Sequence, residues 1–193
     1  MIYSLEGKLE THGENFLVLN AAGIGFKILT NKDTLSKAET LKGTVKFFCF
    51  LYVRDEQMEL YGFLEEQALK FFEMLNTISG VGPKTALGIL DIDSVPNIMA
   101  AIIEKKSEFL TRTSGIGKKT AERVILELNG RIKLPGAKAL TEKMSIDMEV
   151  EEALVGLGYP RYDIRRALSD LDFQATTLEQ RLRAALKAIS KKF

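Results

Sequence analysis

The sequence has few of the residues that build metal centres, disulfides or stacking platforms: one cysteine, one histidine and no tryptophan. A single cysteine excludes an internal disulfide framework and is typical of a reducing, cytosolic setting. Because Cys49 lies in the apolar run VKFFCFLYV, we interpret it as a buried thiol and not a reactive one. His12 has neither a second histidine nor a cysteine pair to complete a zinc site. We therefore expect no metal and no cofactor.

The chain as a whole also lacks an excess of charge, because its formal net charge is only +1 at pH 7. The distribution is uneven, since residues 105–133 carry eight Lys and Arg against three acids, whereas residues 1–64 carry seven against eight. A local basic excess favours an anionic partner. No window approaches the roughly 20 apolar residues of a membrane span. The first residues also do not match a signal peptide, so we expect no membrane association.

What the sequence does contain divides it into regions of different periodicity. Residues 1–64 hold about five short runs rich in Val, Ile, Phe, Tyr and Leu, which predicts a small closed barrel such as an OB-fold. The polar insert at 31–43 is expected to hold one helical turn. Residues 65–133 show helical spacing, 134–146 are interpreted as a linker, and 147–193 as three short helices. The predicted fold class is α+β with several domains.

One motif of glycines and lysines occurs twice in the helical region. ISGVGPKTALGIL at 78–90 matches TSGIGKKTAERVI at 113–125, and the two Gly-x-Gly turns are 35 residues apart. A short predicted helix precedes each copy, and each copy opens another helix. The pattern indicates a duplicated helix–turn–helix unit.

A nucleotide-binding loop is the first interpretation of such glycines, and it fails. The P-loop pattern G-x-x-x-x-G-K-[ST] would need glycine at Arg112 and Ser or Thr at Lys119. The dinucleotide pattern G-x-G-x-x-G fails because Thr85 and Thr120 stand where its third glycine belongs. Neither copy follows a predicted strand.

Binding of a nucleic-acid backbone fits the same residues better. Two glycines one residue apart allow positive φ and leave no side chain between the backbone and a ligand. The next helix presents its first N–H groups and its positive dipole end to a phosphate. Lys84, Lys118 and Lys119 add charge, and two copies would hold two phosphates without reading a base. Plain interhelical turns also use Gly-x-Gly, so it is the duplication together with the lysines that favours phosphate.

SGVGPKTA and SGIGKKTA resemble the tandem helix-hairpin-helix motifs of the RuvA family, the Holliday junction-binding subunits of bacterial branch-migration machines. RDEQMELYGF at 54–63 is similar to the end of that family's OB domain. EEALVGLGY at 151–159 is similar to the start of its small three-helix, UBA-like domain. The implied domains are an OB domain at 1–64, a tandem helix-hairpin-helix domain at 65–133, a linker at 134–146 and a RuvB-binding domain at 147–193.

The resemblance also implies a function. Four subunits would form a flat platform, as one tetramer or as two stacked face to face, that binds four-way junction DNA and holds it open as a square. The RuvB AAA+ ATPase would be recruited as the motor, and the RuvC resolvase would join the larger complex. The chain itself carries no Walker motif, and the resemblance implies a non-catalytic, cytoplasmic, nucleoid-associated subunit that acts in recombination and repair.

By the same resemblance, glycine amides and the side chains that follow them would hold the DNA backbone. The implied set is Gly80, Gly82, Lys84, Thr85, Gly115, Gly117, Lys118, Lys119, Thr120 and Arg123. Arg123 has an alternative role, an i, i+4 surface pair with Glu127 worth only about 0.2–0.5 kcal/mol. The two roles are compatible.

Asp55 and Glu56 lie between two predicted strands, where acids usually belong to a solvated turn. The resemblance implies instead an acidic pin at the centre of the tetramer. Its carboxylates would repel phosphates and help to part the strands entering the centre. Adjacent acids can also bind Mg²⁺ for hydrolysis, but no acid–histidine constellation accompanies them in the sequence.

By the same resemblance, the apolar positions through which the third domain would contact RuvB are Leu154, Leu157, Tyr159 and Leu182. The alternative is that they form the core of the three-helix domain, which for Leu154 and Leu157 is at least as strongly expected. The short linker would limit the reach of this domain.

Two other classes of protein compete with a junction-binding scaffold. A helix-hairpin-helix glycosylase or nuclease needs a catalytic carboxylate beside the hairpin. The helix after the second copy carries Glu122 and Glu127, and no Asp follows before residue 147. A single-strand binder would stack bases on the barrel, but the phenylalanines of VKFFCF are typical of a core.

Overall fold

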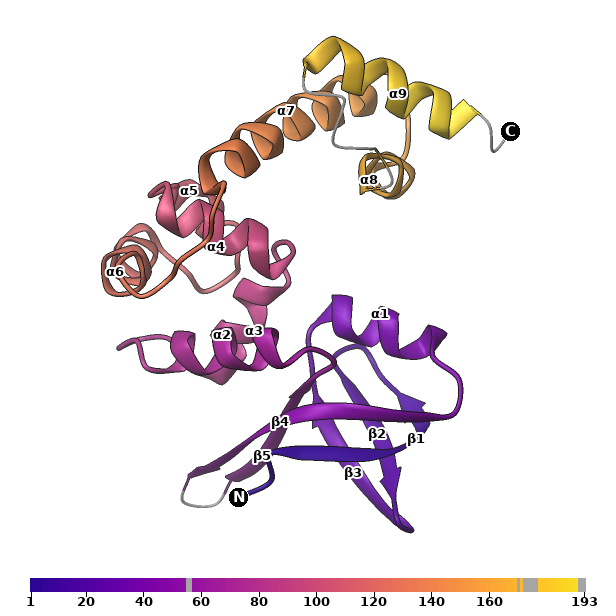
Figure 1. The fold of residues 1–193 in the computed structure, drawn as a ribbon, viewed down its shortest axis with the longest axis vertical. Coiled ribbons are helices and arrows are strands. Elements are labelled where there is room, and N and C mark those ends of the chain that lie inside the picture. Colours follow the sequence, from indigo (N-terminus) through magenta and orange to yellow (C-terminus); the bar gives the residue numbers. More distant parts are fainter. Residues whose placement is uncertain (55–56, 170, 172–176, 191–193) are drawn as a thin grey trace. The chain divides into compact units, whose positions relative to one another are not determined.

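The computed structural model describes residues 1–54, 57–169, 171 and 177–190. The chain divides into two compact units, Met1–Leu134 and Pro135–Phe193 (Figure 1). Each unit has its own cluster of buried apolar residues and is described by itself.

The first unit begins with a closed five-stranded barrel. Its strands are β1 (Ser4–His12), β2 (Phe16–Ala21), β3 (Ile24–Leu29), β4 (Thr44–Arg54) and β5 (Gln57–Phe63). They close in the order β1-β2-β3-β5-β4, with β4 paired to β1 and with β3 and β5 parallel. Alternate side chains point inward, so that Leu17, Leu19, Phe47 and Cys49 are buried. The predicted OB-type barrel is confirmed.

The polar insert between β3 and β4 forms the helix α1 (Lys32–Thr40), which is longer than the single turn predicted from the sequence. It buries Thr34, Leu35 and Ala38, and the last two belong to the core of the barrel. Packing of this narrow face stabilises a helix whose full length its polar composition did not predict.

The predicted helices follow the barrel. They are α2 (Glu66–Asn76), α3 (Pro83–Leu90), α4 (Val95–Ile103), α5 (Ser107–Leu110) and α6 (Lys118–Leu128). Ser94 caps α4, because its hydroxyl accepts a hydrogen bond from the Asn97 amide at 3.4 Å. Within the described residues, no single helix is long and apolar enough to span a membrane. Helices α3 and α4 meet that criterion only as a pair bent by 98°.

Aromatic packing joins these helices to the barrel. The ring of Phe72 on α2 lies against the rings of Phe50, Tyr61 and Phe63 on β4 and β5, with centroid distances of 5.6, 5.2 and 5.1 Å. Phe72 and Phe63 are fully buried. The start of the helical region is therefore fixed on the outer face of these two strands.

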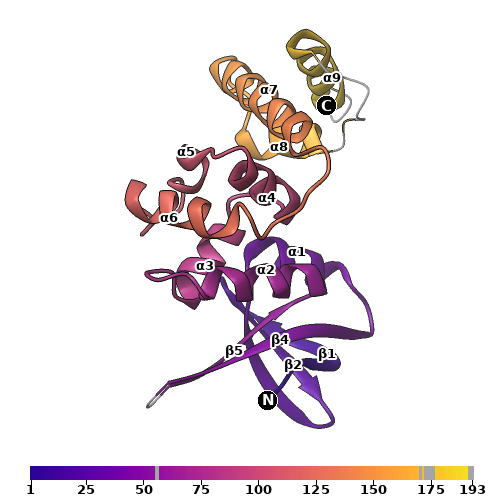
Figure 2. The same ribbon diagram turned by 60° about the vertical axis from the view of Figure 1, so that its left-hand side comes forward.

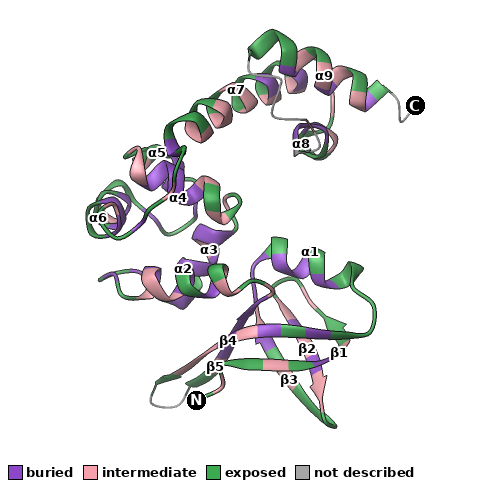
Figure 3. Ribbon diagram, viewed as in Figure 1, coloured by how far each residue is buried: buried purple, intermediate pink, exposed green. Residues whose placement is uncertain are grey.

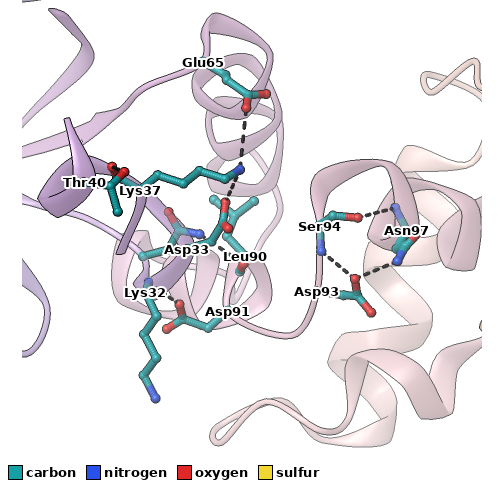
Figure 4. Close-up of polar contacts among 11 residues, drawn as sticks. Lys32, Asp33, Lys37, Thr40, Glu65, Leu90, Asp91, Asp93, Ser94 and Asn97 are labelled. Carbon is teal, nitrogen blue, oxygen red and sulfur yellow. Dashed lines mark hydrogen bonds and ion pairs between the residues drawn. The ribbon is translucent and has the colours of Figure 1, made fainter. Parts of the chain in front are cut away.

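Helix α1 makes a second connection, formed by polar groups (Figure 4). The Lys32 amide donates to the Asp91 carboxylate at 2.7 Å, just after α3. The Lys37 ammonium lies 2.8 Å from Asp33 and 3.7 Å from Glu65, which precedes α2. The hydrogen bond with Asp33 raises the pKa of Lys37. These contacts help to hold the helices that carry the first motif copy in a defined position on the barrel.

The second unit is a three-helix domain made of α7 (Ala137–Gly156), α8 (Arg161–Ser169) and α9 (Leu178–Ser190). Its core contains Val150, Leu154, Ile164, Ala167, Leu168, Ala185 and Ile189. Arg181 of α9 is fully buried and donates from Nε to the carboxylate of Asp147 on α7. The predicted C-terminal helical domain is confirmed.

The segment at 134–146 differs from the predicted linker, because α7 already begins at Ala137. Pro135 and Gly136 separate this helix from the first unit, and Gly136 has a φ of +77°. The following residues contain no Gly or Pro until Gly156 and are rich in Ala, Leu, Glu, Lys and Met, which favour helix. Figure 3 shows that most of the first half of α7 is not buried, so no apolar periodicity revealed it. The domain boundaries themselves stay a prediction.

Candidate nucleic-acid interface

The first motif copy forms a tight turn between α2 and α3. Gly80 has a φ of +87°, in the left-handed region that glycine adopts without strain. Val81 is only 4% exposed, and its amide donates to Ile78 O at 3.0 Å. Gly82 follows with a φ of −91° as the N-cap of α3. The apolar residue anchors the turn in the core and leaves both glycines exposed.

The second copy repeats this geometry between α5 and α6. Gly115 has a φ of +85°, and Gly117 caps α6 with a φ of −83°. Ile116 between them is 5% exposed, and its amide donates to Thr113 O at 3.1 Å. Because the dihedral angles and hydrogen bonds correspond, the sequence repeat is also a structural repeat.

Each turn leads into a helix. The first backbone amides of that helix come before its first intrahelical hydrogen bond, so they have no acceptor within the helix. That bond joins Ala86 N to Gly82 O at 2.8 Å in α3, and Ala121 N to Gly117 O at 3.0 Å in α6. The amides before it point out of the helix end. A Cβ placed on Gly82 or Gly117 would meet no heavy atom within 4 Å, so a ligand has room to approach. Such an end suits a phosphate.

The predicted side chains lie at the same two helix ends. Lys84 is exposed in the first turn of α3, and Lys118 and Lys119 are exposed in the first turn of α6. Thr85 and Thr120 are half-buried beside them. The structure therefore places each group of predicted residues together, with lysine charge next to open backbone. The arrangement can hold two anions by charge and by hydrogen bonds.

Arg123 makes a contact that the sequence did not predict. Its Nη1 donates to Ser79 O, in the turn of the first copy, at 3.0 Å. Within the described part of the chain, no ion pair joins it to Glu127. Arg131, which we did not single out from the sequence, donates from Nη1 to Thr77 Oγ1 at 3.3 Å. These contacts span 44 and 54 residues, so no local pattern could identify them.

Asp55 and Glu56 lie outside the described residues, so their predicted role stays a prediction. The flanking strands β4 and β5 pair as far as Arg54 with Gln57. Figure 2 shows this two-stranded ribbon extending beyond the barrel. Val53 and Met58 near its end are 58% and 74% exposed.

The four residues predicted to contact RuvB occupy different positions in the three-helix domain. Leu154 is fully buried in the core, as the alternative interpretation expected. Tyr159 and Leu182 are half-buried and pack against that core. Leu157 is 68% exposed at the end of α7. Leu157 is therefore the one of the four with most of its side chain open to a partner.

Cys49 and His12 do not form a reactive site in the structure. Burial raises the pKa of the Cys49 thiol to about 11, so the nucleophilic thiolate is scarce at neutral pH. His12 is exposed, with Nδ1 3.2 Å from a Glu39 oxygen. Across the described ranges, no group of three or more His, Cys, Asp or Glu side chains is placed to hold a metal ion.

Three protein-family models together match most of the chain. Family models described as RuvA N terminal domain, SAM-like helix-hairpin-helix tandem, and RuvA C-terminal domain match residues 1–62, 72–129 and 148–190.

Curated relatives named Holliday junction branch migration complex subunit RuvA are similar over their full length. The protein from Chloroflexus aggregans is 38% identical over 97% of both chains. Those from Acetivibrio thermocellus and Caldanaerobacter subterraneus are 34% and 36% identical over 99% of this chain and all of theirs. With these full-length relatives and both RuvA terminal-domain models matched in chain order, the chain belongs to the RuvA family.

Proposed function

We propose that this chain binds four-way junction DNA through its phosphate backbone, without reading base sequence. The observation that carries the proposal is the pair of matching hairpins, each with exposed glycines, outward helix amides and exposed lysine. Contacts of this type position a protein on nucleic acid but do not distinguish bases. The curated relatives are named as subunits of a Holliday junction branch migration complex, which agrees with such a site.

The finer assembly is part of the same proposal. Four copies form a flat platform, as one tetramer or as two face to face, that holds the junction open as a square. The RuvB ATPase binds the three-helix domain and supplies the movement, and the RuvC resolvase joins the larger complex. The chain is a non-catalytic cytoplasmic subunit. The exposed Leu157 supports a role for the third domain in recruiting the motor.

Asp55 and Glu56 act in this proposal as an acidic pin that repels phosphates at the centre of the junction. Asp55→Asn with Glu56→Gln removes both charges and keeps the size of the side chains. We expect junction affinity to be unchanged or higher, and the rate of RuvB-driven branch migration to change. A large loss of junction affinity in a gel-shift titration would contradict the role of these two residues as an acidic pin.

The binding mode is tested by gel-shift titration of the full chain with four-way and linear DNA, with the mass of the complex measured by light scattering. We expect tighter binding to the four-way junction and a mass of one or two tetramers. Equal affinity for both DNA forms contradicts junction recognition. Cleavage of either substrate by the pure protein in the presence of Mg²⁺ contradicts the non-catalytic assignment.

The phosphate sites are tested by Lys118→Ala with Lys119→Ala. We expect weaker binding to junction and duplex alike, and a salt dependence of affinity that is flatter by about 0.9 for each lost contact. Lys32→Ala with Lys42→Ala is a matched control, because both lysines are exposed on the barrel side of the unit. An unchanged salt slope in the first variant would place these lysines outside the interface.

A further inference from the structure

The two hairpins differ at one position that matters for an anion. The residue after the second glycine is Pro83 in the first copy and Lys118 in the second. Proline has no amide N–H and no charge, so the first helix end offers one backbone donor fewer and one cationic side chain fewer. If the two copies bind phosphate with comparable strength, the first must obtain donors from elsewhere in the fold.

Arg123 lies where such a donor is needed, although it belongs to the helix of the second hairpin. Its Nη1 is 3.0 Å from Ser79 O and 3.8 Å from the position that a Cβ on Gly80 would occupy. The guanidinium therefore lies directly against the glycine turn of the first hairpin. A guanidinium has five N–H donors, and the bond to Ser79 uses one of them.

Arg131 adds a second guanidinium on the same turn. It follows α6, is exposed, and donates from Nη1 to Thr77 Oγ1 at 3.3 Å. The segment from Arg123 to Arg131 thus directs two cations to residues 77–80 of the first hairpin. The second hairpin, to which this segment belongs, already has Lys118 and Lys119 at the start of its helix.

We propose that Arg123 and Arg131 complete the phosphate site of the first hairpin, and so make the tandem motif one composite site instead of two independent ones. The inference rests on the proposed function, because it assumes that the hairpins hold DNA phosphates. The two guanidinium groups supply the charge and the donors that Pro83 cannot. Their bonds to the turn also fix its position relative to α6, so that the two hairpins meet the DNA as one unit.

The test is a double-mutant cycle in the full chain, in which matched substitutions block the phosphate site of one hairpin or the other. Gly82→Asn and Gly117→Asn are suitable blocks, because both positions have negative φ and open space. Asparagine is a good N-cap whose side-chain oxygen accepts from the first amides of the helix, which are the donors a phosphate would use. Neither block changes the charge, so the salt slope stays interpretable.

Arg123→Ala alone should weaken junction binding about tenfold, the value of one net charge-assisted hydrogen bond. It should also flatten the salt slope by about 0.9. In the Gly82→Asn background we expect the further loss to fall below about twofold, since the site is already disabled. In the Gly117→Asn background the full loss should remain. Arg131→Ala should follow the same pattern.

Other outcomes overturn the inference in distinct ways. Equal losses in both backgrounds, or coupling to Gly117→Asn instead, would show that Arg123 does not serve the first hairpin. A loss of affinity with a lower melting temperature and an unchanged salt slope would make Arg123 a structural tether only. Arg123→Lys should keep the salt slope and lose part of the affinity, because an ammonium cannot bond Ser79 and a phosphate in the same fork geometry. If neither asparagine block weakens binding, it is the proposed hairpin sites that fail.

Discussion

The two glycines of each hairpin have different physical roles. Gly80 and Gly115 have φ values of +87° and +85°, which a side chain with a Cβ adopts only with strain. Gly82 and Gly117 have ordinary negative φ, so the backbone does not require glycine there. Their value is the space that a missing side chain leaves in front of the helix amides.

This difference predicts opposite effects of substitution at neighbouring residues. Gly80→Ala should lower the free energy of unfolding by about 1–2 kcal/mol, because alanine is strained in the left-handed region. Gly82→Asn should leave it unchanged or raise it by a few tenths of a kcal/mol, as asparagine caps helices well, while junction binding weakens. Urea unfolding and gel-shift titration measure the two quantities. A Gly80→Ala variant as stable as the parent would show that the turn relaxes to another conformation.

At the scale of elements, the hairpins interlock where α3 meets the turn before α6. Thr113 is 9% exposed, and its Oγ1 donates to Gly88 O at 3.1 Å. A Cβ on Gly88 would lie 2.7 Å from the Thr113 methyl carbon, which is too close for two carbon atoms. Glycine inside α3 therefore allows the close approach of the second hairpin.

Gly88→Ala should consequently destabilise the protein by about 1–3 kcal/mol through overpacking, although alanine favours helix by about 1 kcal/mol. Adding Thr113→Ser removes the methyl group and keeps the hydroxyl, so the double variant should recover most of the loss. Thr113→Ser alone is the control. If the double variant is no more stable than Gly88→Ala, the contact between methyl groups is not the cause.

Elements with a regular apolar pattern were predicted well, and those without one were not. The strands of the barrel were predicted from runs rich in Val, Ile, Phe, Tyr and Leu, and the structure buries every second residue of such runs, for example Leu17 and Leu19. The length of helix α1 was underestimated and the first half of α7 was missed, because each buries few residues and periodicity therefore carries little signal. In α7 the helical state follows from propensity and from the break at Pro135 and Gly136.

At the scale of the whole molecule, the chain separates at Leu134 into two units with separate cores. The hairpins lie in the first unit, and the exposed Leu157 lies in the second. The proposed DNA binding and the proposed recruitment of the motor therefore fall in parts of the chain that can be tested independently.

We expect a fragment of residues 1–134 to fold cooperatively and to bind junction DNA with the salt slope of the full chain. It should not stimulate the ATPase activity of RuvB on junction DNA. Full-length Leu157→Ala is the matched comparison, since an exposed side chain can be truncated with little effect on folding. Leu154→Ala should instead unfold the third domain, because it removes a fully buried core residue at a cost of about 2–5 kcal/mol. If the fragment stimulated the ATPase activity of RuvB, the third domain would not be required for recruitment.

The sequence by itself determined the strands of the barrel, the duplicated hairpin and the local basic charge, because each depends on residues close together in the chain, and its motifs also indicated the family. Only the tertiary structure decided that Arg123 reaches Ser79, that Thr113 packs on Gly88, and that Leu154 is buried while Leu157 is exposed. Periodicity reports burial one turn or one strand at a time. A contact across 44 residues depends on how whole elements pack, which no local pattern encodes. The second hairpin and its helix α6 thus looked self-contained in the sequence, whereas Arg123 of that helix lies against the turn of the first hairpin.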